Sequence, residues 1–130
     1  MNDARHDLLR QSVIDAPVVM KGDYAYFIHP LSDGVPQQSA ELLAAARDLI
    51  HEQVDWDNVD IIIGIEAMGI PLATALSLAS GKPLVVGRKR AYGLPGEFAI
   101  DQTTGYSKGE IYLNDVRQGD RVLLVDDVVS

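Results

Sequence analysis

The stretch that decides the fold is Arg121-Val-Leu-Leu-Val-Asp-Asp-Val-Val-Ser130, which closes the printed sequence. Its apolar run Val122–Val125 has the length and composition of a strand buried on both faces of a sheet. Two acids, Asp126 and Asp127, follow at the point where such a strand reaches the surface. In open parallel α/β sheets, ligands collect at the carboxyl ends of the strands. Paired carboxylates at that place suit a sugar diol, a metal or a developing positive charge.

A second strand end lies earlier in the chain. Asp60–Ile65 has the pattern of a buried strand, and Ala67-Met68-Gly69 that of a tight turn. Pro71–Ala79 then reads as a helix with proline in its first turn, and Pro83–Val86 as the next strand. This order predicts a βαβ unit with a right-handed crossover, and hence a parallel sheet. Backbone N–H groups in the turn after Glu66 can hold an anion at the start of the helix, although a plain strand–helix turn explains the same residues.

Basic residues end the next strand of that unit. Arg88-Lys89-Arg90 stands out in an acidic chain, and such a cluster can bind polyphosphate, whereas a solvated charge run is the competing interpretation. Residues 92–108 contain glycine and proline but little periodicity, which predicts a long irregular flap. A flap that carries Tyr106 and Lys108 would exclude water and add a cation to a phosphate site, and a disordered hairpin is the alternative.

The remaining elements are short. We expect helices at 4–14 and at 40–53 (the second capped by Ser39), strands at 18–20, 24–28, 110–114 and 121–125, and a loop at 29–36. The 130 residues therefore predict one α/β domain, with residues 1–36 as a small N-terminal hood and residues 37–130 as the core.

Composition excludes several classes of function. There is no cysteine, which removes disulfides, thiolate catalysis and cysteine-based metal sites. A net charge of −8 disfavours nucleic-acid binding through a basic face, and it fits either ordinary surface solubility or adaptation to high salt. No apolar stretch reaches the length of a membrane span, and the polar N-terminus does not resemble a signal peptide, so we expect a cytoplasmic protein. The three histidines have no ligand spacing.

Taken together, these motifs resemble the type I phosphoribosyltransferases. Val122–Ser130 resembles the first part of the family's phosphoribosyl pyrophosphate signature, and Glu66-Ala-Met-Gly69 occupies the place of its pyrophosphate loop. Arg88-Lys-Arg90 with Tyr92-Gly-Leu-Pro-Gly96 resembles the strand and flap start of the adenine phosphoribosyltransferase branch. Phe27-Ile-His-Pro-Leu-Ser-Asp33 resembles the base-binding hood. The set as a whole is most similar to archaeal hypoxanthine/guanine phosphoribosyltransferases.

The resemblance implies a Mg²⁺-dependent purine salvage enzyme that uses phosphoribosyl pyrophosphate and acts as a homodimer, with Pro71–Ala79 as a candidate contact. Asp126 and Asp127 would hold the ribose hydroxyls and favour an oxocarbenium-like transition state, with Mg²⁺ bound through the substrate and at most through these two acids. The remaining substrate-binding residues that it implies are Glu66, Ala67, Met68, Gly69, Arg88, Lys89, Tyr106, Lys108, Ser130 and, stacked on the base, Phe27.

Two departures from the family pattern affect these expectations. Many 6-oxopurine enzymes place an acid where this chain has Ser130, so no general acid or base is assigned and the choice of base stays open. Hypoxanthine or guanine is the first expectation, adenine is an alternative, and a non-catalytic nucleotide-sensing regulator on the same fold is another. The family's 5′-phosphate loop is absent from the printed sequence, so we expect a C-terminally truncated domain, inactive and marginally stable, whose natural form continues with a strand–helix–strand segment.

Overall fold

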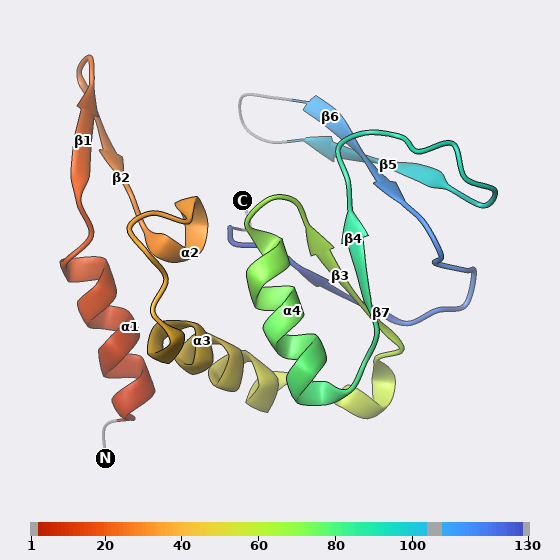
Figure 1. The fold of residues 1–130 in the computed structure, drawn as a ribbon, viewed down its shortest axis with the longest axis horizontal. Coiled ribbons are helices and arrows are strands. Elements are labelled where there is room, and N and C mark those ends of the chain that lie inside the picture. The colour runs from red at the N-terminus through yellow and green to blue at the C-terminus, as the bar shows by residue number, and fades with distance from the viewer. Residues whose placement is uncertain (1–2, 104–107, 129–130) are drawn as a thin grey trace. The chain divides into compact units, whose positions relative to one another are not determined.

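The computed structural model describes residues 3–103 and 108–128. The chain divides into two compact units, Met1–Val54 and Asp55–Ser130. Figure 1 shows the elements of both units. The α/β class expected from the sequence is confirmed, whereas the hood boundary expected at residue 36 stays a prediction.

The first unit contains three helices and one hairpin within its described residues. They are α1 (Ala4–Ile14), β1 (Val18–Lys21), β2 (Tyr24–Phe27), α2 (Pro30–Asp33) and α3 (Ala40–Gln53). The cap predicted for α3 is confirmed, since the Ser39 hydroxyl accepts a hydrogen bond from the Leu42 N–H at 3.0 Å. The loop expected at 29–36 is wrong in part, because α2 forms inside it with a proline at its start and Gly34 (φ 76°) at its end.

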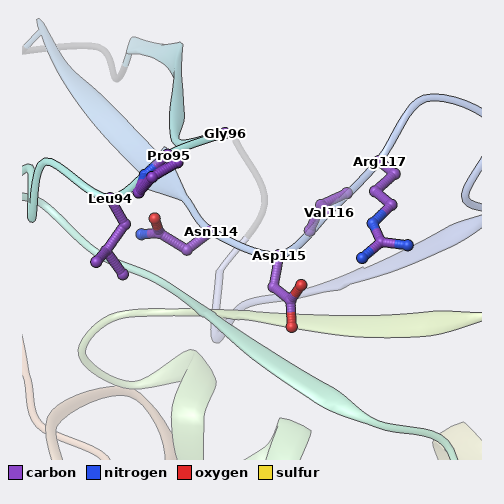
Figure 2. Close-up of a pocket in the computed structure, with 7 residues that line it drawn as sticks. All are labelled: Leu94, Pro95, Gly96, Asn114, Asp115, Val116 and Arg117. Carbon is purple, nitrogen blue, oxygen red and sulfur yellow. The ribbon is translucent and has the colours of Figure 1, made fainter.

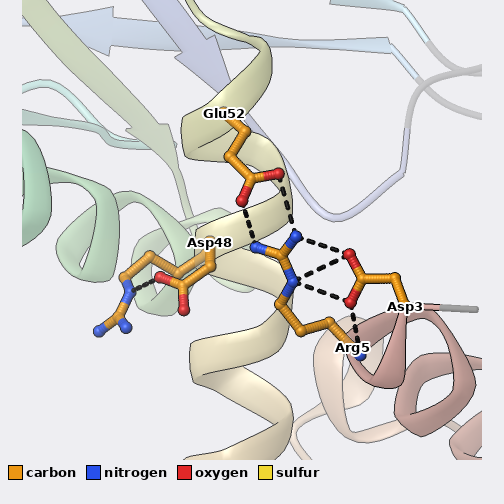
Figure 3. Close-up of polar contacts among 5 residues, drawn as sticks. Asp3, Arg5, Asp48 and Glu52 are labelled. Carbon is orange, nitrogen blue, oxygen red and sulfur yellow. Dashed lines mark hydrogen bonds and ion pairs between the residues drawn. The ribbon is translucent and has the colours of Figure 1, made fainter. Parts of the chain in front are cut away.

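An ion-pair network ties α1 to α3 (Figure 3). The Arg5 guanidinium donates to the Asp3 carboxylate at 2.6 Å and also pairs with Glu52 on α3. Asp3 caps α1 as well, by accepting from the Arg5 N–H at 2.9 Å. The hydrogen bonds from Arg5 lower the pKa of Asp3 to about 2. This network has a structural role within the first unit.

His29 is buried, and both nitrogens of its ring form hydrogen bonds within the first unit. Its Nδ1 accepts from the Leu31 N–H at 3.2 Å, so the ring proton lies on Nε2, 2.9 Å from the Ser12 hydroxyl. Burial lowers the pKa of His29, which favours this neutral form. The histidine that links α1 to the start of α2 is therefore a packing residue, in agreement with the absence of ligand spacing in the sequence.

The second unit is built on a three-stranded parallel sheet in the order β4-β3-β7. Its elements are the short 3-10 helix η1 (Trp56–Asn58), β3 (Ile61–Ile65), α4 (Gly69–Ser80), β4 (Leu84–Gly87), β5 (Phe98–Thr103), β6 (Lys108–Leu113) and β7 (Val122–Val125). The predicted βαβ unit is confirmed as β3–α4–β4. Within the described ranges no helix has both the length and the apolar character needed to cross a membrane.

β3 is buried on both of its faces. One face points toward α4, because a Cβ built on Gly64 would lie 2.7 Å from the Cβ of Ala73. The other face carries Ile63 and Ile65, which pack with Ile111 and Leu113 of β6. Side chains alternate across a strand, so the apolar run of β3 supplies both layers of the core.

The structure corrects two expectations about the second unit. Val122–Val125 is not buried on both faces: β7 pairs with β3 along one edge, and within the described residues the side chains of Val122 and Leu124 are 46% and 58% exposed. An apolar run does not reveal how many neighbours a strand has. The flap is not irregular throughout, because β5 pairs with β6 over six residue pairs, from Phe98↔Leu113 to Thr103↔Lys108. Most side chains of β5 are exposed, so the alternation that marks a half-buried strand is missing from its sequence.

Candidate functional site

The site lies at the carboxyl edge of the sheet, where three parallel strands end together. Glu66 follows β3, Arg88 follows β4, and Asp126 follows β7. The strand register places Ile65 opposite Gly87 and Gly64 opposite Val125, so the three ends lie side by side. The sequence predicted chemistry at each end separately, and the parallel sheet brings the three ends together.

At Gly69 the loop after β3 closely approaches the backbone that leads into the acids after β7. A Cβ built on Gly69 would lie 2.5 Å from the Val125 carbonyl oxygen and 3.2 Å from the Cα of Asp126. Only a residue without a side chain permits this approach. α4 begins at Gly69, and its N-cap residue Met68 makes no side-chain cap. The first N–H groups of a helix lack intrahelical partners, so the start of α4 offers anion-binding donors beside Asp126.

Asp126 and Asp127 interact with each other. The Asp127 N–H donates to Asp126 Oδ1 at 2.9 Å, and both side chains are half-buried. Burial raises the pKa of Asp127 to about 6, and the neighbouring Asp126 carboxyl adds to the rise. At neutral pH Asp127 is therefore mostly ionised, but its pKa is close enough to neutrality for its protonation to respond to what binds beside it. Two adjacent carboxylates at a strand end form an electronegative acceptor site.

Glu66 contacts the basic cluster on the neighbouring strand. Its Oε1 accepts from the Arg88 Nε at 3.1 Å and from the Lys89 backbone N–H at 2.5 Å. These contacts lower the pKa of Glu66, with the Lys89 N–H as the largest cause. Glu66 was predicted to bind substrate, and this role stays a prediction; in the structure one of its carboxylate oxygens, Oε1, accepts from two protein donors. Arg88 remains 41% exposed in its side chain.

The flap begins with a clamp that the sequence analysis missed. The Glu97 carboxylate accepts from the backbone N–H groups of Tyr92 and Gly93, at 2.9 and 3.0 Å, and from the Asn114 amide at 2.9 Å. The Tyr92 ring lies 5.5 Å from the Arg88 guanidinium and 4.8 Å from that of Arg90. A glutamate directly after Leu-Pro-Gly was the available signal, because a carboxylate there can accept from the N–H groups of the turn.

A cavity of about 530 Å³ lies in the second unit, beside the base of the flap (Figure 2). It is lined by Leu94, Pro95, Gly96, Asn114, Asp115, Val116 and Arg117. Leu94, Pro95 and Gly96 belong to the predicted flap, and none of the seven residues was predicted to bind substrate. The Asn114 Oδ1 is buried without a hydrogen-bond partner among the described residues.

The remaining predicted site residues fall in different places. Lys108 begins β6 at the rung of the hairpin farthest from Leu113, and it is exposed. Phe27 ends β2 in the first unit, where it stacks on His29 with ring centroids 5.6 Å apart. Tyr106 and Ser130 lie outside the described residues. The roles proposed for these four residues stay predictions.

Asp126 and Asp127 are the candidate oxygen donors for Mg²⁺ in the site. Within residues 3–103 and 108–128 no group of three or more potential metal ligands comes together. Mg²⁺ in phosphate-transfer sites is typically held by one or two carboxylates, with water and substrate oxygens completing its shell. The oxygen donors of Asp126 and Asp127 fit that pattern.

Comparison with known proteins identifies relatives along the chain. Residues 37–130 match the model of the phosphoribosyl transferase domain. Over 124 residues the chain is 56% identical to a protein from Methanohalophilus mahii named hypoxanthine/guanine phosphoribosyltransferase. It is 55% identical to HGPRTase-like protein 1 from Haloquadratum walsbyi, also over 124 residues. These alignments cover 95% of this chain and 65% and 66% of the two relatives, so the chain spans about two thirds of their length.

Solved structures are similar to the chain in fold. The adenine phosphoribosyltransferase from Rhodothermus marinus superposes with a TM-score of 0.69 at 22% identity, over 95% of this chain and 69% of that one. The enzyme from Saccharomyces cerevisiae, in complex with an imino-altritol bisphosphate and adenine, superposes with a TM-score of 0.68 at 20% identity. The superposition covers 93% of this chain and 72% of that one. At these identities the likeness concerns the fold alone.

Proposed function

Because the chain belongs to the phosphoribosyl transferase domain family, we propose that it transfers a 5-phosphoribosyl group from phosphoribosyl pyrophosphate to a purine base and releases pyrophosphate. The observation that carries the proposal is the meeting of the Gly69 loop with Asp126 at the edge where Arg88 also emerges. Anion-binding donors and paired carboxylates then lie together, as a sugar that carries a phosphate leaving group requires.

Hypoxanthine or guanine is the base that we propose. Two archaeal relatives at 56% and 57% identity carry the name hypoxanthine/guanine phosphoribosyltransferase. The adenine enzymes among the solved structures are 22% identical or less in the examples named above, so they support the fold and not the base. Adenine is therefore the second candidate.

The reaction forms a bond from a purine nitrogen to the sugar C1 and breaks the bond from C1 to the pyrophosphate oxygen. The purine nitrogen gives up its proton, and the electron pair leaves with pyrophosphate. As that bond breaks, C1 becomes electron-poor and the ring oxygen shares its positive charge. Asp126 and Asp127 accept hydrogen bonds from the ribose hydroxyls and stabilise this charge electrostatically.

The leaving group needs positive partners. The N–H groups at the start of α4 and the guanidinium of Arg88 hold the pyrophosphate in this proposal. Mg²⁺, when bound with the substrate, neutralises part of the phosphate charge, and Asp126 and Asp127 are the residues that would hold it. Lys108 and Tyr106 on the flap, Ser130, and Phe27 as the residue that stacks on the base complete the set. A homodimer and a cytoplasmic location stay predictions.

The test uses the chain extended at its C-terminus with the family's segment that carries the 5′-phosphate loop. The purified protein is incubated with phosphoribosyl pyrophosphate, Mg²⁺ and each of hypoxanthine, guanine and adenine, and nucleotide and pyrophosphate are measured together. We expect equal amounts of both products with hypoxanthine or guanine. Product with adenine alone would overturn the base assignment. Binding of a nucleotide without turnover of any base would favour the non-catalytic regulator.

A further inference from the structure

Glu66 presents a physical problem for an anion site. It directly precedes the loop that we propose for pyrophosphate, where a carboxylate repels a phosphate. Its side chain is 23% exposed, and Oε1 is bonded to both the Arg88 Nε and the Lys89 N–H. A carboxylate at this position is explained if it acts on Arg88, to which it is hydrogen-bonded, and does not itself contact the ligand.

The geometry of the Arg88 side chain shows what Glu66 contributes. A guanidinium offers five N–H donors in a rigid planar fork, and only one of them belongs to Nε. The contact with Glu66 uses Nε, and neither terminal nitrogen of Arg88 donates to an acceptor among the described residues. The centroid of the Tyr92 ring lies 5.5 Å from the guanidinium carbon of Arg88, so this ring is a second neighbour that restricts the guanidinium. The two terminal nitrogens are the pair that can bind a phosphate in a bidentate manner.

We propose that Glu66 is a positioning residue that acts through Arg88. By accepting from Nε, it fixes the plane of the guanidinium so that the terminal nitrogens receive the pyrophosphate group of the substrate. By accepting from the Lys89 N–H, it also fixes the end of β4 from which Arg88 projects. This inference rests on the proposed function, because it assumes that Arg88 binds pyrophosphate.

Two effects of Glu66 on an anion oppose each other, and two neutral variants separate them. Glu66→Gln removes the charge but keeps an oxygen that accepts from Arg88 and Lys89. Glu66→Met has similar size and no charge, and it lacks an effective acceptor. If Glu66 only repelled anions, both variants would bind pyrophosphate more tightly and to the same extent. If it positions Arg88, the methionine variant binds more weakly than the glutamine variant.

The experiment is calorimetric titration of the purified protein with pyrophosphate in the presence of Mg²⁺. We expect Glu66→Gln to stay within about threefold of the wild type and Glu66→Met to bind about tenfold more weakly than Glu66→Gln, because a hydrogen bond to a charged group is lost. The matched control is the same pair of substitutions at Glu41, an exposed residue in the first turn of α3, which should leave binding unchanged. Glu66→Ala replaces the methionine variant if thermal melting shows that the latter does not fold.

A double-mutant cycle tests whether the effect passes through Arg88. In the Arg88→Gln background, Glu66→Gln and Glu66→Met should bind pyrophosphate equally, because the group that Glu66 positions is gone. Equal affinities of the two variants with Arg88 intact would overturn this inference alone. Absence of pyrophosphate binding by the wild type would overturn the proposed role of the cluster and this inference with it.

Discussion

Asp127 is the residue whose ionisation the fold changes most clearly within the site. A carboxyl with a pKa of about 6 is costly to ionise, and the chain retains it beside a second carboxylate. Packing alone does not account for two acids at a strand end, since an amide of the same size would avoid the cost. A carboxyl group whose pKa is raised in this way is typical of functional positions.

The loss of these acids should reduce activity and leave the fold intact. We expect Asp126→Asn combined with Asp127→Asn to lower kcat/KM by about two to three orders of magnitude, because the developing positive charge loses its electrostatic partners. The circular dichroism spectrum should stay unchanged, since both side chains sit at a strand end. Near-normal turnover in the double variant would contradict the role proposed for the pair.

The pKa of Asp127 also predicts how stability depends on pH. The folded protein keeps the Asp127 proton where the unfolded chain has released it, so the stability that this proton contributes is present below about pH 3.8 and is lost as the pH rises through about 6. Asp127→Asn does not titrate, so it should become more stable than the wild type as the pH rises through that window, by about 3 kcal/mol at neutral pH, since the pKa is raised from 3.8 to about 6. Urea unfolding at several pH values measures the difference. A difference that does not change between pH 4 and 7 would show that Asp127 is not the titrating group.

Gly69 is the residue on which the assembly of the site depends most directly. Glycine-to-alanine substitution there would place a methyl group 2.5 Å from the Val125 carbonyl oxygen, so α4 or β7 must move. We expect a loss of about 1–3 kcal/mol of stability and a loss of activity through displaced N–H donors. Gly109→Ala is the matched control, because nothing lies within 4 Å of its added Cβ and its φ is not left-handed. Equal melting temperatures of the two variants would contradict the close contact.

At the scale of elements, β3 and the β5–β6 hairpin differ in how they are held. β3 is covered on both faces, whereas the rungs of the hairpin near Thr103 and Lys108 have exposed side chains. Among the described residues, the base of the hairpin is anchored through Ile111 and Leu113 in the core and through Glu97 at the turn. A strand pair that is packed at its base and exposed along its length can act as a hinged cover.

Hydrogen exchange should show this gradient along the hairpin. We expect amides near Gln102 and Gly109 to exchange faster than those of Ile62 and Ile63, and amides near Ile111 to be protected. Addition of phosphoribosyl pyrophosphate with Mg²⁺ should slow the fast amides if the hairpin covers the bound substrate. Uniform protection in the free protein, with no change on addition of substrate, would count against a gating role.

At the scale of the whole molecule, the remaining question is association. α4 uses Leu72, Ala73 and Leu76 to cover the sheet, and Leu78 is left 83% exposed. We expect a homodimer that buries the outer side of α4, as the resemblance implies, and Leu78→Glu should weaken it. Light scattering at several concentrations measures the mass of both proteins. A monomer mass for the wild type would overturn the expectation, and an unchanged dimer in the variant would place the contact elsewhere.

The amino-acid sequence by itself determined most of the elements and pointed to the family, whereas the roles of the site residues stay predictions. The caps, the turn residues and the apolar runs predicted α1, α3, the β1–β2 hairpin and the βαβ unit, because each depends on neighbours within a few residues. The acids after β7 and the basic cluster after β4 were visible for the same reason. Together with the resemblance, these motifs led to the family to which the chain belongs.

Only the tertiary structure decided which of these residues meet. The commitment of Glu66 to Arg88, the contact of Gly69 with Val125 and the clamp made by Glu97 each join residues more than three positions apart, whose distance depends on sheet register. The placement of β7 beside β3 and the pairing of β5 with β6 were not predicted for a related reason. Strand neighbours are chosen by backbone hydrogen bonds, which every residue except proline can donate and which therefore leave little trace in the sequence.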